Sequence, residues 1–161
     1  MTVKEYNICV ETYSDNVYRF ILRSMRDGDE AQDIVQESFT KMWERVERIS
    51  FEKSKSYLFT TAYHTMIDRI RKGKRISSIE DASYIESFTN NQYTDLQEIL
   101  ERAVDRLSKI QKDVVLLRDY EGYSYEEIGR ITDLSESQVK VYIYRARKTL
   151  RQYIGKLENV T

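Results

Sequence analysis

The sequence predicts an all-α protein made of two small helical domains joined by a flexible linker. Its 161 residues include no proline and only five glycines, which favours long helices over turn-rich β structure. Apolar residues recur at steps of three to four through most of the chain, the period of an amphipathic helix. This period is lost over residues 77–94, where Ser, Asn, Thr and acidic residues predominate. The expected domains are therefore 1–76 and 96–156, with a linker at 77–95.

Three helices are expected in the first domain. The first carries an apolar stripe over residues 6–21 and stops near Asp27, before a glycine that permits a turn. Asp29 is expected to cap the second helix, whose apolar side includes Trp43, a candidate core residue. A loop should follow, and then a third helix over about 54–72 that ends in a cluster of cations.

Two short basic segments stand out against a net charge of only −1. Residues 53–76 contain seven basic side chains and one acidic, and residues 137–161 contain six basic and one acidic. Because nucleic-acid binding depends on local rather than net charge, the pattern permits one DNA-binding surface in each half of the chain. Two solvated helix faces would give the same pattern, so charge alone does not decide.

The strongest local motif is a pair of helix starts in the C-terminal half. Ser124 and Glu127 have the spacing of a capping box, and Ser135 and Gln138 repeat it eleven residues later. So short a separation leaves room for one short helix and a tight turn, with small Gly129 where the helices approach. This predicts a helix-turn-helix whose second helix enters the major groove, with a plain helical hairpin as the alternative. The outward side of the second helix would carry Glu136, Ser137, Lys140, Val141, Tyr144, Arg145 and Lys148.

Residues 107–151 resemble region 4 of the sigma-70 family, especially its compact extracytoplasmic-function (ECF) type. The matching positions are Leu107, Gln111, Val114 to Arg118, Glu121-Gly122, Ser124 to Ile128, Val139-Lys140 and Arg145 to Arg147. Ser108 replaces a frequent proline, and Asp133 replaces the usual glycine of the turn. Asp tolerates a left-handed backbone better than most residues, so the second change is mild. The resemblance assigns the seven outward residues to the −35 promoter element.

Residues 1–76 resemble sigma region 2 along almost their whole length. The run from Asp29 to Phe39 and Lys41-Met-Trp match region 2.2, and Tyr57-Leu-Phe with Ile67-Asp-Arg continue the match. A response regulator, which can end in a similar helix-turn-helix, would need a β/α receiver domain, and no strand-period alternation is present.

The resemblance implies three binding sites. Core RNA polymerase, through its β′ clamp helices, would dock on Asp29, Asp33, Gln36, Glu37, Phe39 and Lys41. The −10 element would meet Ser50, Phe51, Lys53, Tyr57, Tyr63, His64, Arg69, Arg71, Lys72 and Arg75, which combine stacking aromatics with cations. Tyr57 is open to two interpretations, a core residue or a base contact. The family also implies contact with the polymerase β flap, promoter DNA and an anti-sigma factor, and the absence of regions 1.1 and 3.

Other functional classes lack their motifs. There is no Gly-rich phosphate loop, no Cys/His metal spacing and no nucleophile beside a histidine base, so we expect no enzyme, cofactor or metal site. No apolar run approaches the roughly 18 residues that are needed to span a membrane, and the N-terminus lacks the pattern of a signal peptide. A cytoplasmic protein is therefore expected. Cys9 is expected to be a core thiol. Two alternatives stay open, a dimeric helix-turn-helix transcription factor and a protein-interaction module such as a sigma mimic or adaptor.

Overall fold

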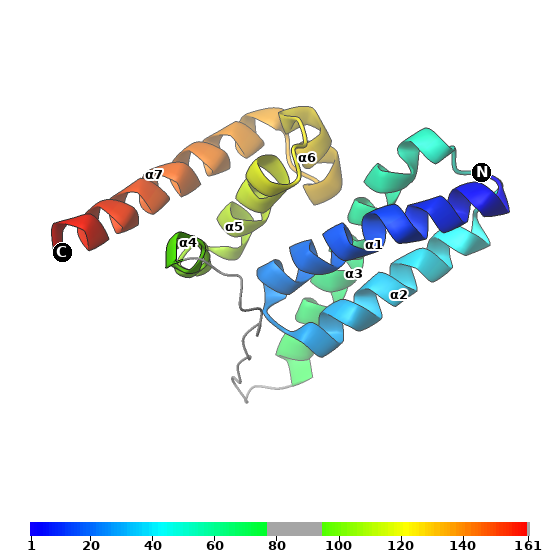
Figure 1. Cartoon of the computed structure of the whole chain (residues 1–161), viewed down its shortest axis with the longest axis horizontal. Coiled ribbons are helices and arrows are strands. Elements are labelled where there is room, and N and C mark those ends of the chain that lie inside the picture. The colour runs from blue at the N-terminus through cyan, green and yellow to red at the C-terminus, as the bar shows by residue number, and fades with distance from the viewer. Residues whose placement is uncertain (77–94, 161) are drawn as a thin grey trace. The chain divides into compact units, whose positions relative to one another are not determined.

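The computed structural model describes the backbone of residues 1–76 and 95–160, and the side chains of 1–73 and 95–156. Every element in these ranges is helical, as predicted (Figure 1). The chain divides into two compact units, one holding α1 to α3 and the other α4 to α7. The predicted linker lies outside the described residues, except for Asp95, which begins α4. No helix in the described ranges is long and apolar enough to cross a lipid bilayer.

Over residues 1–76, the first unit is a bundle of three α-helices. They are α1 (Val3–Met25), α2 (Gly28–Glu44) and α3 (Ser54–Ile76), with one 3₁₀ turn, η1 (Phe51–Lys53), before α3. Each helix packs against the other two. The shared core contains Cys9, Val17, Phe20, Ile21, Ile34, Met42, Leu58, Phe59, Ala62 and Met66, all at most 1% exposed. The expected burial of the lone thiol is confirmed.

Asp27, and not Asp29, caps α2. The Asp27 carboxylate accepts a hydrogen bond from the Glu30 backbone N–H at 3.1 Å, which satisfies one of the free donors of the first turn. The preceding residue, Arg26, ends α1 in the left-handed conformation, with φ 58°. The chain therefore reverses within two residues, and Asp29 lies inside the first turn of the new helix.

Trp43 lies at the surface, which corrects its assignment to the core. Its side chain is 46% exposed, although its ring packs edge-on against Tyr6 at a centroid distance of 5.0 Å. Its neighbour Met42 is fully buried. A single residue step turns a helix by about 100°, so Met42 faces the bundle and Trp43 lies at the rim.

Over residues 95–160, the second unit contains four α-helices and one π-helical turn. These are α4 (Asp95–Asp105), α5 (Lys109–Val115), the π-helix η2 (Leu116–Tyr120), α6 (Tyr125–Thr132) and α7 (Glu136–Val160). The long helix α7 packs against α4, α5 and α6. The core includes Leu107, Val114, Leu116, Leu117, Ile128, Ile131, Val139, Ile143 and Ala146. The π-helical turn was not expected from the sequence.

Both predicted capping boxes are present at the helix-turn-helix. Ser124 and Glu127 exchange hydrogen bonds of 3.1 and 2.9 Å at the start of α6, and Ser135 and Gln138 do the same at the start of α7. Asp133 ends α6 in the left-handed conformation with φ 62°, as the sequence predicted.

Candidate nucleic-acid and partner interfaces

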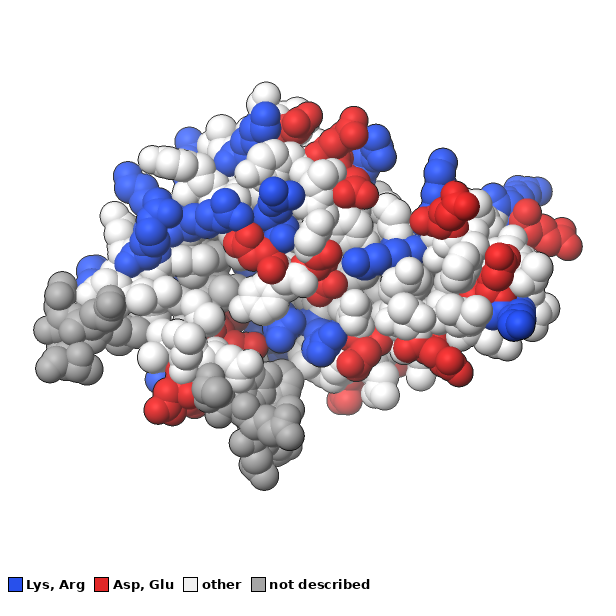
Figure 2. All heavy atoms as spheres, turned by 45° about the horizontal axis from the view of Figure 1, so that its top comes forward, with Lys and Arg blue, Asp and Glu red and all other residues white. Residues whose placement is uncertain are grey.

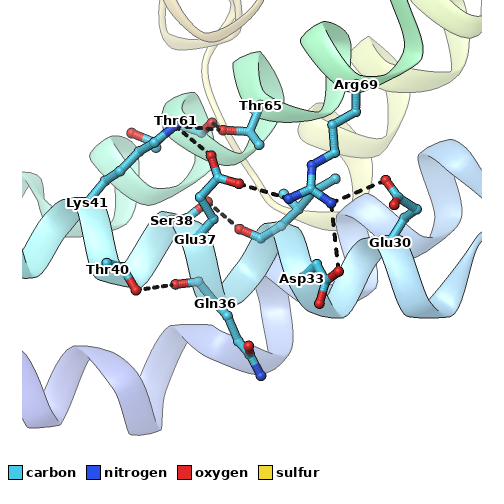
Figure 3. A network of polar contacts seen from close by, with 11 residues as sticks. Glu30, Asp33, Gln36, Glu37, Ser38, Thr40, Lys41, Thr61, Thr65 and Arg69 are labelled. Carbon is cyan, nitrogen blue, oxygen red and sulfur yellow. Dashed lines mark hydrogen bonds and ion pairs between the residues drawn. The ribbon is translucent and has the colours of Figure 1, made fainter. Parts of the chain in front are cut away.

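The polar side of α2 consists of two parallel stripes. Residues three, four or seven positions apart lie on the same side of a helix. The outer stripe contains Asp29, Asp33 and Gln36, which are all exposed. The inner stripe contains Glu30, Glu37 and Lys41, whose side chains are 39%, 38% and 44% exposed and lie toward α3 (Figure 3).

Arg69 reaches from α3 into the inner stripe. Its Nη1 lies 3.2 Å from Glu30 Oε2, and its Nη2 donates to Glu37 Oε1 at 2.8 Å (Figure 3). Asp33, on the outer stripe, is farther away at 3.9 Å. The Arg69 side chain is only 29% exposed. Its guanidinium group is planar and positively charged, and it can bind two carboxylates at once. Arg69 therefore joins α3 to two carboxylates of α2 that lie about two helical turns apart.

Lys41 completes this network from the other side. Its Nζ lies 3.0 Å from Glu37 Oε2 and 3.3 Å from the hydroxyl of Thr65, a buried residue of α3. Hydrogen bonds from Lys41 and Arg69 hold the pKa of Glu37 below its ordinary value of 4.5. The hydrogen bond to Glu37 correspondingly raises the pKa of Arg69. The inner stripe is internally neutralised, whereas the outer stripe presents its charge to solvent.

The structure separates Arg69 from the other cations expected at the −10 element. Arg71, two residues later, is 65% exposed, and Lys72 is also exposed. Arg69 differs from them in direction, because its guanidinium pairs with Glu30 and Glu37 on α2. The side chain of Arg75 lies outside the described residues.

Two of the predicted contact aromatics are buried. Tyr63 is 5% exposed and stacks against Phe20 at 6.3 Å between ring centroids. Phe39, expected at the polymerase dock, is 8% exposed and meets Tyr6 edge-on. Both rings lie on core-facing sides of their helices, so neither offers a free face to a base or partner. Burial disfavours the two contact roles, which stay untested predictions.

The remaining −10 candidates lie at the surface of the first unit. Ser50, Lys53 and His64 are exposed, while Phe51 and Tyr57 are partly exposed. The Phe51 carbonyl accepts a hydrogen bond of 2.7 Å from Ser54 Oγ, which fixes the turn at the start of α3. The partial exposure of Tyr57 leaves its two interpretations open.

All seven −35 candidates are exposed on α7. Val141 and Tyr144 are 45% and 63% exposed and therefore add apolar surface to this side of α7. Figure 2 shows Lys and Arg side chains gathered along α7. A helix that presents apolar and hydrogen-bonding groups beside cations can contact base edges and phosphates together.

Sequence reasoning missed a cluster of side chains that borders this surface. The guanidinium of Arg118 lies 4.7 Å over the ring of Tyr125 and donates to the Tyr123 carbonyl at 2.8 Å. Lys140 lies 5.8 Å from the same ring and 3.7 Å from the Glu136 carboxylate. Only the Glu136–Lys140 pair, one helical turn apart, was visible in the sequence.

A second contact joins α7 to the π-helical turn. Arg147 forms an ion pair and a hydrogen bond with Asp119, and this hydrogen bond raises the pKa of Arg147. Since the two residues lie 28 positions apart, their pairing could not be read from local spacing. Arg147 thus links α7 to η2 and is distinct from the seven exposed −35 candidates.

Comparisons with known proteins give the same two-part organisation. Residues 9–76 match the family described as sigma-70 region 2, and residues 97–150 match sigma-70 region 4. The chain is 32% identical over 151 residues to the RNA polymerase sigma factor SigV of Bacillus subtilis, with 92% of this chain and 90% of that protein covered. It is 28% identical over 156 residues to the ECF RNA polymerase sigma factor SigM of the same organism, covering 94% of each.

Solved structures support the fold. The sigma factor RpoE from Bartonella quintana, in complex with the anti-sigma factor NepR, aligns with a TM-score of 0.78 and 23% identity. That alignment covers 95% of this chain and 98% of the other. CnrH, in complex with the cytosolic domain of CnrY, aligns with a TM-score of 0.67 and 18% identity over 94% of this chain and 88% of the other. At these identities the likeness establishes the shared fold.

Proposed function

The chain belongs to the sigma-70 family, in its ECF group, and is an alternative sigma factor of transcription initiation; we propose that its interfaces divide this work among α2, the start of α3, and α7. The observation that carries the assignment is the presence of both sigma regions, in order, over most of the chain. A helix-turn-helix alone would be compatible with a generic DNA-binding protein.

Core RNA polymerase binds the polar side of α2 in this proposal. Asp29, Asp33 and Gln36 form an exposed stripe that a basic partner surface can contact. Charge complementarity of this kind guides association and fixes the register of the partner. The Asp33 side chain is 66% exposed and lies 3.9 Å from Arg69, so its carboxylate is more accessible than those of Glu30 and Glu37, which are 39% and 38% exposed.

The −10 element meets Ser50, Phe51, Lys53 and the exposed side of α3. Opening a duplex costs about a few kcal/mol for each unstacked base, which contacts to the single strand must offset. Phe51 and Tyr57 offer partly exposed rings for stacking, while Lys53, Arg71 and Lys72 lie at the surface to meet the backbone.

The −35 element is contacted by α7. Glu136, Ser137, Lys140 and Val141 lie in the first turns, where a recognition helix reaches base edges, and Val141 could meet a thymine methyl group. Arg145 and Lys148 follow one and two turns later and meet phosphates. The chain acts through binding, and the chemistry of transcription belongs to the polymerase.

An anti-sigma factor is a further proposed partner. Support comes from the complexes in which two proteins of the same fold were solved, one with an anti-sigma factor and one with a cytosolic domain.

Reconstitution with core polymerase tests the proposal. The full chain should form a stable complex with core enzyme and support run-off transcription from a promoter with ECF-type −35 and −10 elements. Asp33→Ala should weaken complex formation. A chain that fails to bind core would point to a stand-alone DNA-binding protein, and one that binds core without initiating would point to an adaptor.

A further inference from the structure

We infer that Arg69 is a positioning residue for the polymerase-facing side of α2 and makes no contact with promoter DNA. This inference rests on the proposed function, because it concerns the surface that the proposal assigns to polymerase. It distinguishes Arg69, which acts inside the unit, from Arg71 and Lys72, which face outward.

The first support is the direction of the Arg69 side chain. Its two Nη atoms lie 3.2 Å from Glu30 and 2.8 Å from Glu37, and the side chain is less exposed than either partner. A cation that contacted phosphate from this position would have to break both ion pairs. Arg71 would have to break only an exposed pair with Asp68, at 3.8 Å on the same helix.

The second support is the electrostatics of α2. Glu30, Asp33 and Glu37 follow one another along the helix at steps of three and four, a spacing at which like charges repel. Arg69 lies within 4 Å of all three carboxylates, and Lys41 supports Glu37 from the opposite side. Within the described part of the chain, Arg69 is the only cation that forms an ion pair with Glu30 or Asp33, so its removal would leave both carboxylates without one.

The consequence is a division of labour between the two stripes. Glu30 and Glu37 are held against α3 by Arg69, and this holds the first turns of α2 in place. The same turns carry Asp29 and Asp33, whose charge remains open to a partner. Arg69 therefore acts on polymerase binding through α2.

The test compares Arg69→Met with Arg71→Met in the full chain. Core polymerase affinity is measured at a fixed salt concentration, and promoter affinity of the saturated holoenzyme is measured over a series of salt concentrations. Arg69→Met should weaken core binding about fivefold, the upper range for a partly exposed charge contact, and leave the salt dependence of promoter binding at the wild-type slope. Arg71→Met should reduce that slope by about one.

Rescue by a conservative variant separates positioning from bulk stability. Arg69→Lys keeps the positive charge that attracts Glu30 and Glu37, so core affinity should return to within about twofold of wild type, although an ammonium group lacks the planar fork that binds both carboxylates at once. All variants are measured well below their unfolding temperatures, confirmed by circular dichroism. A stability defect alone would lower the unfolding temperature of Arg69→Met without changing the affinity of the folded protein for core, and that result would overturn the inference.

Two other results would also overturn it. If Arg69→Met binds core normally and loses one unit of salt slope, Arg69 is a DNA contact. If Arg69→Met binds core more tightly, with steeper salt dependence, Arg69 screens the acidic surface instead of positioning it. Asp33→Ala identifies a failure of the underlying proposal, because unchanged core binding in that variant would remove α2 as the docking surface altogether.

Discussion

Replacing Gly129 with alanine should destabilise the helix-turn-helix. Gly129 lies within α6, where an added Cβ would meet the Leu134 carbonyl oxygen at 2.6 Å. An ordinary contact begins near 3.4 Å, so either the turn or the helix would have to move. The turn is held by the left-handed Asp133 and by the Leu134 N–H, which donates to the Gly129 carbonyl at 3.0 Å.

The expected cost follows from two opposing terms. Overpacking against a fixed backbone costs about 3 kcal/mol, at the upper end of its usual range. Alanine recovers about 1 kcal/mol relative to glycine in a helix interior. The net loss is therefore about 2 kcal/mol, which corresponds to a fall of roughly 8–16 °C in the unfolding temperature of a unit of this size.

Thermal and urea unfolding of the full chain, followed by circular dichroism, measure this loss. Gly155→Ala is the matched control, because an added Cβ there meets nothing within 4 Å and the helical preference of alanine should leave α7 as stable or more stable. Promoter binding through the −35 element should fall in Gly129→Ala and persist in Gly155→Ala. A Gly129→Ala protein as stable as wild type would refute the assignment of Gly129 to a close backbone approach.

Three further predictions concern charge, backbone conformation and DNA contact. Because the pKa of Glu37 is lowered in the folded state, its contribution to stability is present above the unfolded pKa near 4.5 and is lost as pH falls through the lower folded value. Urea unfolding between about pH 3 and 6 measures this effect: the free energy of unfolding should fall less toward acid pH in Glu37→Gln than in the wild type. Asp133→Val should destabilise the second unit by about 1–3 kcal/mol, since a β-branched residue is strained at φ 62°, whereas Asp133→Gly should not; urea unfolding of both variants decides. Lys140→Ala should weaken −35-dependent initiation while core binding stays at the wild-type level. Run-off transcription measures initiation and titration with core polymerase measures binding; a fall in both activities would contradict the prediction.

The position of each contact along the chain explains which features were predictable. Both capping boxes of the helix-turn-helix connect residues three positions apart, and the turn at Asp133 depends on one residue's backbone preference. Such features are determined by local chemistry, so sequence reasoning found them. The exposure of all seven candidates on α7 followed equally from helical periodicity.

The burial or exposure of aromatic side chains marks the limit of that reasoning. Tyr63 and Trp43 are both amphipathic aromatics on helices, and either could be core or surface by composition. Packing decided the outcome, because Phe20 of α1 stacks on the buried ring of Tyr63, whereas Trp43 packs against the ring of Tyr6 at the rim of the bundle and stays 46% exposed. The choice of Asp27 over Asp29 as a cap likewise depended on where α1 ended.

The sequence alone determined the all-helical class, the helix-turn-helix, the capping motifs and the two basic segments, since each depends on residues within a few turns of one another. Only the tertiary structure decided which charges are available to partners. Arg69 lies 39 positions from Glu30 and 32 from Glu37, and only the packing of α3 on α2 brings their charges together. Coulombic attraction between them is strong because they are close and partly shielded from water, two conditions that the bundle creates.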